Sequence, residues 1–150
     1  MIGEGHTVTI PLRGYSMRPF LEDGRDKAVL AAADNIRKGD VVLAEICPGQ
    51  YVLHRIINIA DDRIKLLGDG NITPEYCLRR DIKAIATAFY RKGRNTADST
   101  EGRKWQTYSH VWMFLRPIRR VLLKVMRLQK RIYNITNLTG KHNNENKKRI

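Results

Sequence analysis

The run Gln50-Tyr51-Val52-Leu53-His54-Arg55-Ile56-Ile57-Asn58-Ile59 is the longest of six β-like segments in the first 90 residues. Clusters of glycine, aspartate and proline, such as Asp23-Gly24 and Cys47-Pro48-Gly49, separate these segments. Short strands with turn residues between them are typical of an all-β domain. The sequence therefore predicts a mainly β fold, an antiparallel sandwich or half-barrel, over residues 1–90. The other segments are 6–10, 27–31, 40–45, 63–67 and 82–90.

The last 60 residues have a different pattern. Residues 91–108 are polar and weakly patterned, which indicates a linker or loop. From residue 118 to about 135, apolar side chains fall on one half of a helical wheel while Lys and Arg fill most of the other. Pro117 suits the first turn of such a helix. We expect an amphipathic basic helix over 109–138 and a disordered tail over 139–150.

The net charge of +13 lies entirely in this C-terminal part. Residues 1–90 hold 12 Lys/Arg and 12 Asp/Glu, whereas residues 91–150 hold 16 Lys/Arg and 3 Asp/Glu. The basic helix could pack on the β domain, dock on a partner protein, bind nucleic acid, or lie on a membrane surface through residues 109–135. Trp105, Trp112 and Phe114 would anchor it at a membrane surface. Nucleic acid is disfavoured, because its recognition needs no broad apolar face.

Composition also excludes several classes of protein. Cys47 and Cys77 are too few for a disulfide framework and lack metal-ligand spacing. His6, His110 and His142 share no ligand spacing, so we expect neither a metal nor a cofactor. We find no secretory signal and no apolar run long enough to span a bilayer. These observations predict a cytoplasmic or peripherally membrane-associated protein.

A serine and a histidine stand out as candidate catalytic residues. Ser16 lies in Gly14-Tyr15-Ser16-Met17-Arg18-Pro19-Phe20-Leu21, a bend framed by glycine and proline, and His54 lies in the long apolar strand. A serine hydroxyl becomes a nucleophile when a base within hydrogen-bond reach takes its proton, and histidine suits that task. Asp69, in the turn Gly68-Asp69-Gly70-Asn71, would accept a hydrogen bond from the far nitrogen of His54.

Four segments in order resemble the boxes of the signal peptidase I family and the related self-cleaving SOS repressors. They are 14–21, 37–43, 51–56 and 68–71. The resemblance covers about half of the chain and implies a serine peptidase with a signal-peptidase-like β fold. Histidine at position 54 is similar to the Ser-His branch of signal peptidases, since other members have a lysine base. No membrane anchor precedes Ser16, which departs from that branch.

The resemblance assigns further residues. Ser16 matches the nucleophile, His54 the base and Asp69 the first acidic position of the Ser-His branch. The second acidic position falls on Glu75, the weaker candidate for orienting His54. Met17 and Pro19 match residues that shape the bend. The family often has a serine at the position of Gly14, whose hydroxyl helps to hold the oxyanion, so a backbone amide or the Tyr15 hydroxyl must replace it here.

The sequence therefore predicts a serine endopeptidase that cleaves a leader or signal-like peptide through a Ser-His(-Asp) site. The substrate would be a peptide or preprotein, held extended by strand addition. The alternative is a catalytically silent binding module on the same scaffold, attached to a membrane or to nucleic acid by its basic helix. The sequence does not specify the oligomeric state.

Overall fold

The computed structural model describes residues 5–119, 121–126 and 128–129 of the chain. The chain divides into two compact units, residues 1–114 and residues 115–150. The first unit contains all the strands, the helix α1 and every residue of the candidate site.

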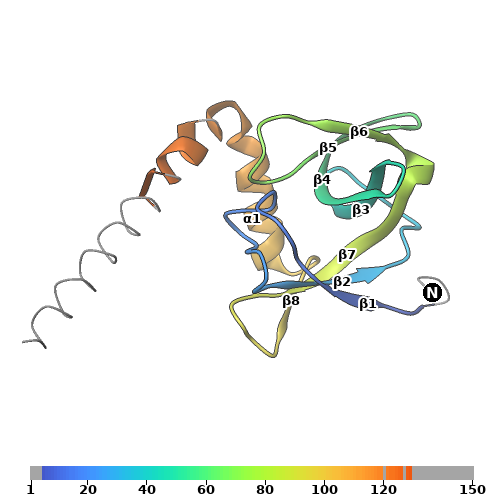
Figure 1. Ribbon diagram of the computed structural model, residues 1–150, viewed down its shortest axis with the longest axis horizontal. Helices are drawn as coiled ribbons and strands as arrows, with labels where there is room; N and C mark the ends of the chain where they lie inside the picture. Colours follow the sequence, from blue (N-terminus) through green and yellow to red (C-terminus); the bar gives the residue numbers. More distant parts are fainter. Residues whose placement is uncertain (1–4, 120, 127, 130–150) are drawn as a thin grey trace, which may run out of the picture. The chain divides into compact units, whose positions relative to one another are not determined.

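Eight antiparallel strands form one sheet, in the order β1-β2-β7-β3-β4-β5-β6, with β8 paired to β7 (Figure 1). The prediction of a mainly β, antiparallel fold is thereby confirmed. β1 and β6 are the two edges of the main path. The strands are β1 (Val8–Pro11), β2 (Lys27–Ala31), β3 (Val41–Cys47), β4 (Gln50–Ala60), β5 (Arg63–Leu67), β6 (Glu75–Leu78), β7 (Ile82–Tyr90) and β8 (Ala97–Ser99).

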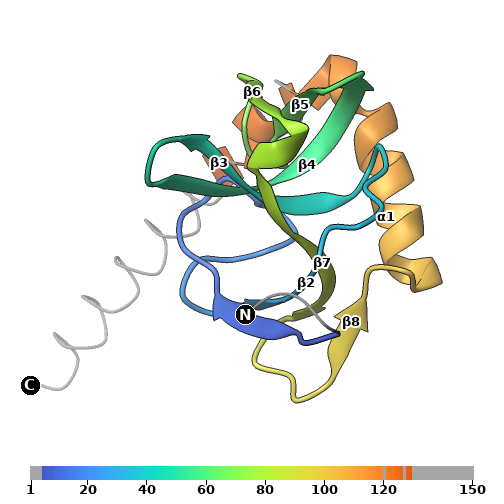
Figure 2. The same ribbon diagram turned by 90° about the vertical axis from the view of Figure 1, so that its right-hand side faces the viewer.

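The sheet is curled around β7, which runs from one half of the domain to the other (Figure 2). β3 pairs with the first residues of β7, whereas β2 and β8 pair with its later part. Register shifts in β2, β3 and β4 mark β-bulges, which bend strands and increase their twist. The curl divides the interior into two apolar clusters, one around Phe89 and the other around Ile56 and Leu66.

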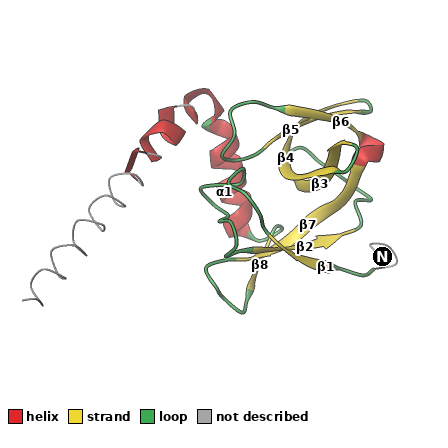
Figure 3. Cartoon of the chain, viewed as in Figure 1, coloured by secondary structure: helices red, strands yellow, loops and turns green. Residues whose placement is uncertain are grey.

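The segment predicted as a linker, 91–108, instead contains β8 and the first half of α1 (Arg103–Phe114), drawn in Figure 3. Trp105 explains the difference, because it is 3% exposed and its ring centroid lies 4.6 Å from that of Phe89. The buried residues of α1 are Trp105, Ser109 and Trp112, and polar and charged residues lie between them, so no continuous apolar stripe marks this helix in the sequence. A short 3-10 helix, η1 (Arg79–Asp81), joins β6 to β7.

The predicted basic helix over 109–138 is described only in part. α1 ends at Phe114, and the 3-10 helix η2 (Arg116–Ile118) contains Pro117. Residues 121–126 and 128–129 are helical, while residues 130–150, including the predicted disordered tail, lie outside the described residues. No helix in the described part of the chain is both long and apolar enough to cross a bilayer.

Candidate active site

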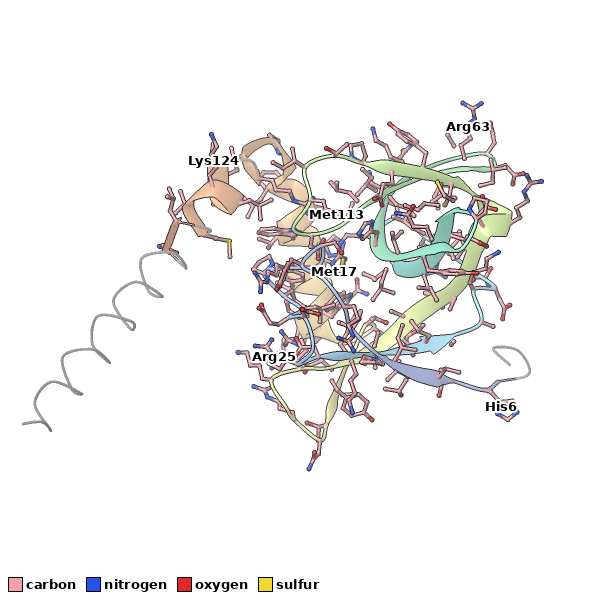
Figure 4. The ribbon with its side chains drawn as sticks, viewed as in Figure 1. His6, Met17, Arg25, Arg63, Met113 and Lys124 are labelled. Carbon is pink, nitrogen blue, oxygen red and sulfur yellow. The ribbon has the colours of Figure 1, made fainter. Side chains whose placement is uncertain are left out.

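Ser16 lies half-buried on the loop that joins β1 to β2. Backbone and side-chain bonds close this loop: the Gly24 N–H donates to Leu12 O at 3.0 Å and the Gly14 N–H donates to Asp23 Oδ1 at 3.0 Å. The next residue, Met17, is 5% exposed and belongs to the apolar cluster around Phe89; it is labelled in Figure 4. The buried methionine thus anchors the loop and leaves its serine at the surface of a cavity.

His54 lies in the middle of β4, opposite Val42 of β3, and is 3% exposed. Its Nδ1 atom is 2.6 Å from Glu75 Oε2 at the start of β6. Neither of these two atoms has another hydrogen-bond partner among the described residues. Glu75 is therefore the acid that faces the outer nitrogen of the imidazole.

Burial lowers the pKa of His54 and is the largest influence on it, while the carboxylate of Glu75 and, more weakly, that of Asp69 act in the opposite direction. The imidazole is therefore neutral at neutral pH. A carboxylate accepts but does not donate, so the proton of the neutral ring lies on Nδ1 beside Glu75. Nε2 then carries a free lone pair, as a general base requires.

The turn at residues 68–71 brings the serine loop and His54 together. The Gly70 N–H donates to Ser16 O at 2.6 Å. A Cβ atom on Gly68 would lie 2.5 Å from Ser16 O and 3.0 Å from His54 Nε2, so only glycine fits between them. The Nε2 side of the imidazole consequently faces the backbone of the nucleophile loop.

Ser16, His54 and Glu75 line one cavity of about 380 Å³. The edge strand β1 and the first half of β4 form its walls, so an extended chain could enter along β1. The cavity thus brings together a serine, a histidine paired with a carboxylate, and apolar walls. The apolar side chains of the lining are Ile10, Pro11, Leu12, Met17, Leu21, Leu43, Val52 and Leu53.

Asp69, which was predicted to accept a hydrogen bond from His54, is instead paired with Arg55. Both side chains are fully buried, and Arg55 donates from Nε to Oδ1 at 2.9 Å and from Nη2 to Oδ2 at 2.7 Å. Such a bidentate pair fixes the carboxylate on the guanidinium. The two acids thus exchange the roles that we expected, because Glu75 takes the place at His54 Nδ1 and Asp69 acts on His54 only as a nearby charge.

Arg55 is a residue that the sequence analysis missed. Its Nη1 donates to Gly39 O and to Ser109 Oγ, both at 2.8 Å, so it joins the sheet to α1. α1 also holds Asp69 directly, since the Tyr108 hydroxyl donates to Oδ2 and Trp112 Nε1 donates to the carbonyl, each at 3.2 Å. An arginine inside an apolar strand could have been found from its need for a buried counter-ion.

The residues expected to shape the site lie in different environments. Tyr15 is 60% exposed, and its ring lies beneath the Arg18 guanidinium at 3.9 Å rather than among the side chains of the cavity. Pro19 is exposed and follows a cis peptide bond. Gly14 has a φ of 83°, a conformation that an L-residue adopts only with strain. A serine hydroxyl at this position is therefore disfavoured by the backbone itself.

Comparisons with known proteins add no family to this description. No family model, no curated protein and no solved structure matches the chain. Among the described residues, no group of three or more His, Cys, Asp or Glu is placed to hold a metal ion.

Proposed function

We propose that the protein is a serine endopeptidase on a signal-peptidase-like scaffold, with Ser16 as nucleophile, His54 as base and Glu75 as the acid that orients His54. The observation that carries the proposal is the buried imidazole, held at Nδ1 by Glu75 at 2.6 Å while Nε2 faces the Ser16 loop. A buried histidine with a carboxylate on one side and a serine loop on the other supports acyl transfer.

The chemistry follows from this arrangement. Ser16 Oγ attacks the carbonyl carbon, its proton passes to His54 Nε2, and the carbonyl electrons move onto oxygen. The tetrahedral intermediate then collapses, the C–N bond breaks, and the leaving amine takes the proton from Nε2. Water hydrolyses the resulting acyl-enzyme by the same two proton transfers. Glu75 stabilises the imidazolium that forms in each half-reaction.

The cavity wall supports an extended substrate. β1 pairs with β2 alone on the main path of the sheet, so its other edge is open to strand addition next to Ser16. Backbone bonds along β1 would hold a peptide in register, and the apolar lining would accept its side chains. A leader or signal-like segment of a preprotein has the extended, apolar character that fits these walls.

A fluorophosphonate probe tests the nucleophile without knowledge of the substrate. We expect the folded protein to be labelled at Ser16, as located by mass spectrometry of the labelled peptide, because the probe reacts with activated serines. Ser16→Ala is expected to abolish labelling, whereas Ser109→Ala, which removes a buried serine outside the cavity, leaves Ser16 labelled. Absence of labelling of the folded protein would favour the alternative, a catalytically silent binding module. The missing hydroxyl at Gly14 is the observation that favours that alternative.

We further propose that residues 118–128 bind an anionic membrane surface, which would bring the peptidase to exported substrates. Ile118, Val121, Val125 and Leu128 recur three and four residues apart and are 46–63% exposed. Lys124, labelled in Figure 4, is an exposed cation between them. Residues 115–150 hold 11 Lys/Arg and one acidic residue. A surface with exposed apolar side chains and strong positive charge is attracted to anionic lipid headgroups. A second copy of the chain fits less well, because it carries the same positive charge.

Vesicle co-sedimentation tests this surface. We expect the full chain to bind vesicles of phosphatidylglycerol and phosphatidylcholine but not phosphatidylcholine alone. Val121→Asp with Val125→Asp should weaken binding at least about 10-fold, because each valine contributes roughly 1.5 kcal/mol when buried. Ile72→Asp, which places the same negative charge at an exposed apolar position of the other unit, is the control. Unchanged binding by the double variant contradicts the proposal, and a dimer that dissociates in that variant assigns the face to a second copy.

A further inference from the structure

Asn71 is a polar residue of the candidate cavity that the proposed mechanism does not yet use. Asn71 ends the turn that follows β5, and it lines the same cavity as Ser16, His54 and Glu75. Its backbone N–H donates to Gly68 O at 2.9 Å, which closes the turn and fixes the position from which its side chain extends. The amide group therefore belongs to the site, and its role there needs an explanation.

The side-chain amide of Asn71 lies next to Gly68, close to His54 and to the backbone of Ser16. The point that a Gly68 Cβ would occupy is 2.9 Å from Asn71 Nδ2, 3.0 Å from His54 Nε2 and 2.5 Å from Ser16 O. The amide nitrogen, the catalytic nitrogen and the backbone of the nucleophile thus converge on a single point. Asn71 Nδ2 therefore borders the same side of Gly68 as His54 Nε2 and the Ser16 carbonyl, in the cavity that an acyl group on Ser16 would occupy.

The side-chain amide of Asn71 is also free to donate. None of the described residues forms a hydrogen bond with it, although its backbone and all its neighbours in the turn are bonded. It is not sealed from the cavity, since it is absent from the buried polar atoms that lack a partner. A primary amide has two N–H donors, so it can meet negative charge that develops in the cavity.

The proposed reaction needs such a donor. A tetrahedral intermediate places negative charge on the former carbonyl oxygen, and serine peptidases hold this oxyanion with two or more N–H or O–H groups. The backbone N–H of Ser16 supplies one, because no described residue accepts a hydrogen bond from it. The second is missing, since Gly14 has no side chain and Tyr15 is 60% exposed outside the cavity lining.

We propose that Asn71 Nδ2 donates the second hydrogen bond to the oxyanion, so that Asn71 is a catalytic residue of this site. The inference rests on the proposed serine peptidase activity. It explains how the chain works without the hydroxyl that Gly14 lacks, because an amide from the turn at 68–71 reaches the same oxyanion from the His54 side. The second oxyanion donor would thus come from the turn at 68–71 and not from the loop that holds Ser16.

The test compares second-order rate constants for labelling of Ser16 by a fluorophosphonate, whose phosphoryl oxygen becomes charged as the serine adds. We expect Asn71→Ala to lower the rate constant by about 10²–10³-fold, as the loss of one oxyanion donor does. Asn71→Asp, which keeps the shape but replaces the donor by an acceptor, should lower it at least as far. Asn58→Ala, which removes an exposed asparagine from β4, should remain within about threefold of the wild type.

A second readout separates stabilisation of the oxyanion from positioning of the base. The pH dependence of labelling reports the pKa of His54, and we expect it to be unchanged in Asn71→Ala while the maximum falls. Thermal unfolding of the three variants checks that each keeps its fold. Labelling of Asn71→Ala within threefold of the wild type overturns the role of Asn71 and leaves the peptidase proposal intact. Absence of labelling in the folded wild type overturns both.

Discussion

Replacement of Glu75 by glutamine is expected to lower the rate constant for fluorophosphonate labelling of Ser16 by about 10²–10⁴-fold, as loss of the triad carboxylate does in other serine peptidases. Glu75 Oε2 is 2.6 Å from His54 Nδ1, and this buried contact has no substitute among the described residues. A neutral amide cannot stabilise the imidazolium that forms when His54 takes the serine proton. It can also present its NH₂ to Nδ1 and favour the wrong tautomer.

The same substitution should shift the pH dependence. Burial lowers the pKa of His54, and the nearby Glu75 carboxylate partly offsets this effect by raising the pKa. Removing that carboxylate leaves burial unopposed except by Asp69, so the pKa of His54 falls further. His54 acts as a base only when deprotonated, and the acidic limb of the labelling profile should therefore move to lower pH as the maximum decreases.

Glu45→Gln is the matched control for this prediction. Glu45 lies on β3 and pairs with Lys83 at 3.1 Å, outside the candidate cavity, so its loss should change labelling by no more than about threefold. A Glu75→Gln protein that labels as fast as the wild type, with an unshifted acidic limb, would contradict the assignment of Glu75 as the acid of the site.

Replacement of Arg55 by methionine is expected to lower the free energy of unfolding by about 3–5 kcal/mol, because it leaves the Asp69 carboxylate buried without its cation. Arg55 and Asp69 are both fully buried and joined by two bonds of 2.9 and 2.7 Å. Arg55 also donates to Ser109 on α1, so the substitution loosens the helix from the sheet. Urea denaturation, with a fixed slope for all variants, measures the change.

Two controls isolate the buried charge. Arg80→Met breaks the pair with Asp81, in which the Arg80 side chain is 82% exposed, and should cost no more than about 1 kcal/mol because solvent screens that pair. Arg55→Met combined with Asp69→Leu should recover much of the loss, since no unpaired charge remains buried. A double variant that is as unstable as Arg55→Met alone would show that packing, and not the uncompensated carboxylate, causes the loss.

Substitution of each acid should have a different main effect. Glu75→Gln should reduce labelling with a small change in stability, because Glu75 is half-buried and contacts His54. Asp69→Asn should reduce stability first, since its carboxylate is held by Arg55 and Tyr108. The acid that we propose to orient His54 and the acid that joins α1 to the sheet are thus different residues.

Much of this fold follows from local patterns in the sequence. Six of the eight strands, β1 to β5 and β7, were predictable because alternation of apolar residues and turn residues such as Asp23-Gly24 act over a few positions, whereas β6 and β8 were not predicted. Ser16 and His54 were identified for the same reason, since each lies in a short segment with a recognisable composition. The beginning of α1 was missed, because its buried face of Trp105, Ser109 and Trp112 includes a serine and lies within an otherwise polar segment.

Only the tertiary structure shows which acid pairs with His54 and which pairs with Arg55. His54 and Arg55 are consecutive on β4, so their side chains point to opposite faces of the sheet, and each needs an acid on its own face. Asp69 and Glu75 are six residues apart, and nothing local tells which acid meets which strand face. The sequence by itself determined a β domain with a serine, a histidine and two acids. Only the curl of the sheet and the docking of α1 decided that Arg55 takes Asp69 and leaves Glu75 to His54.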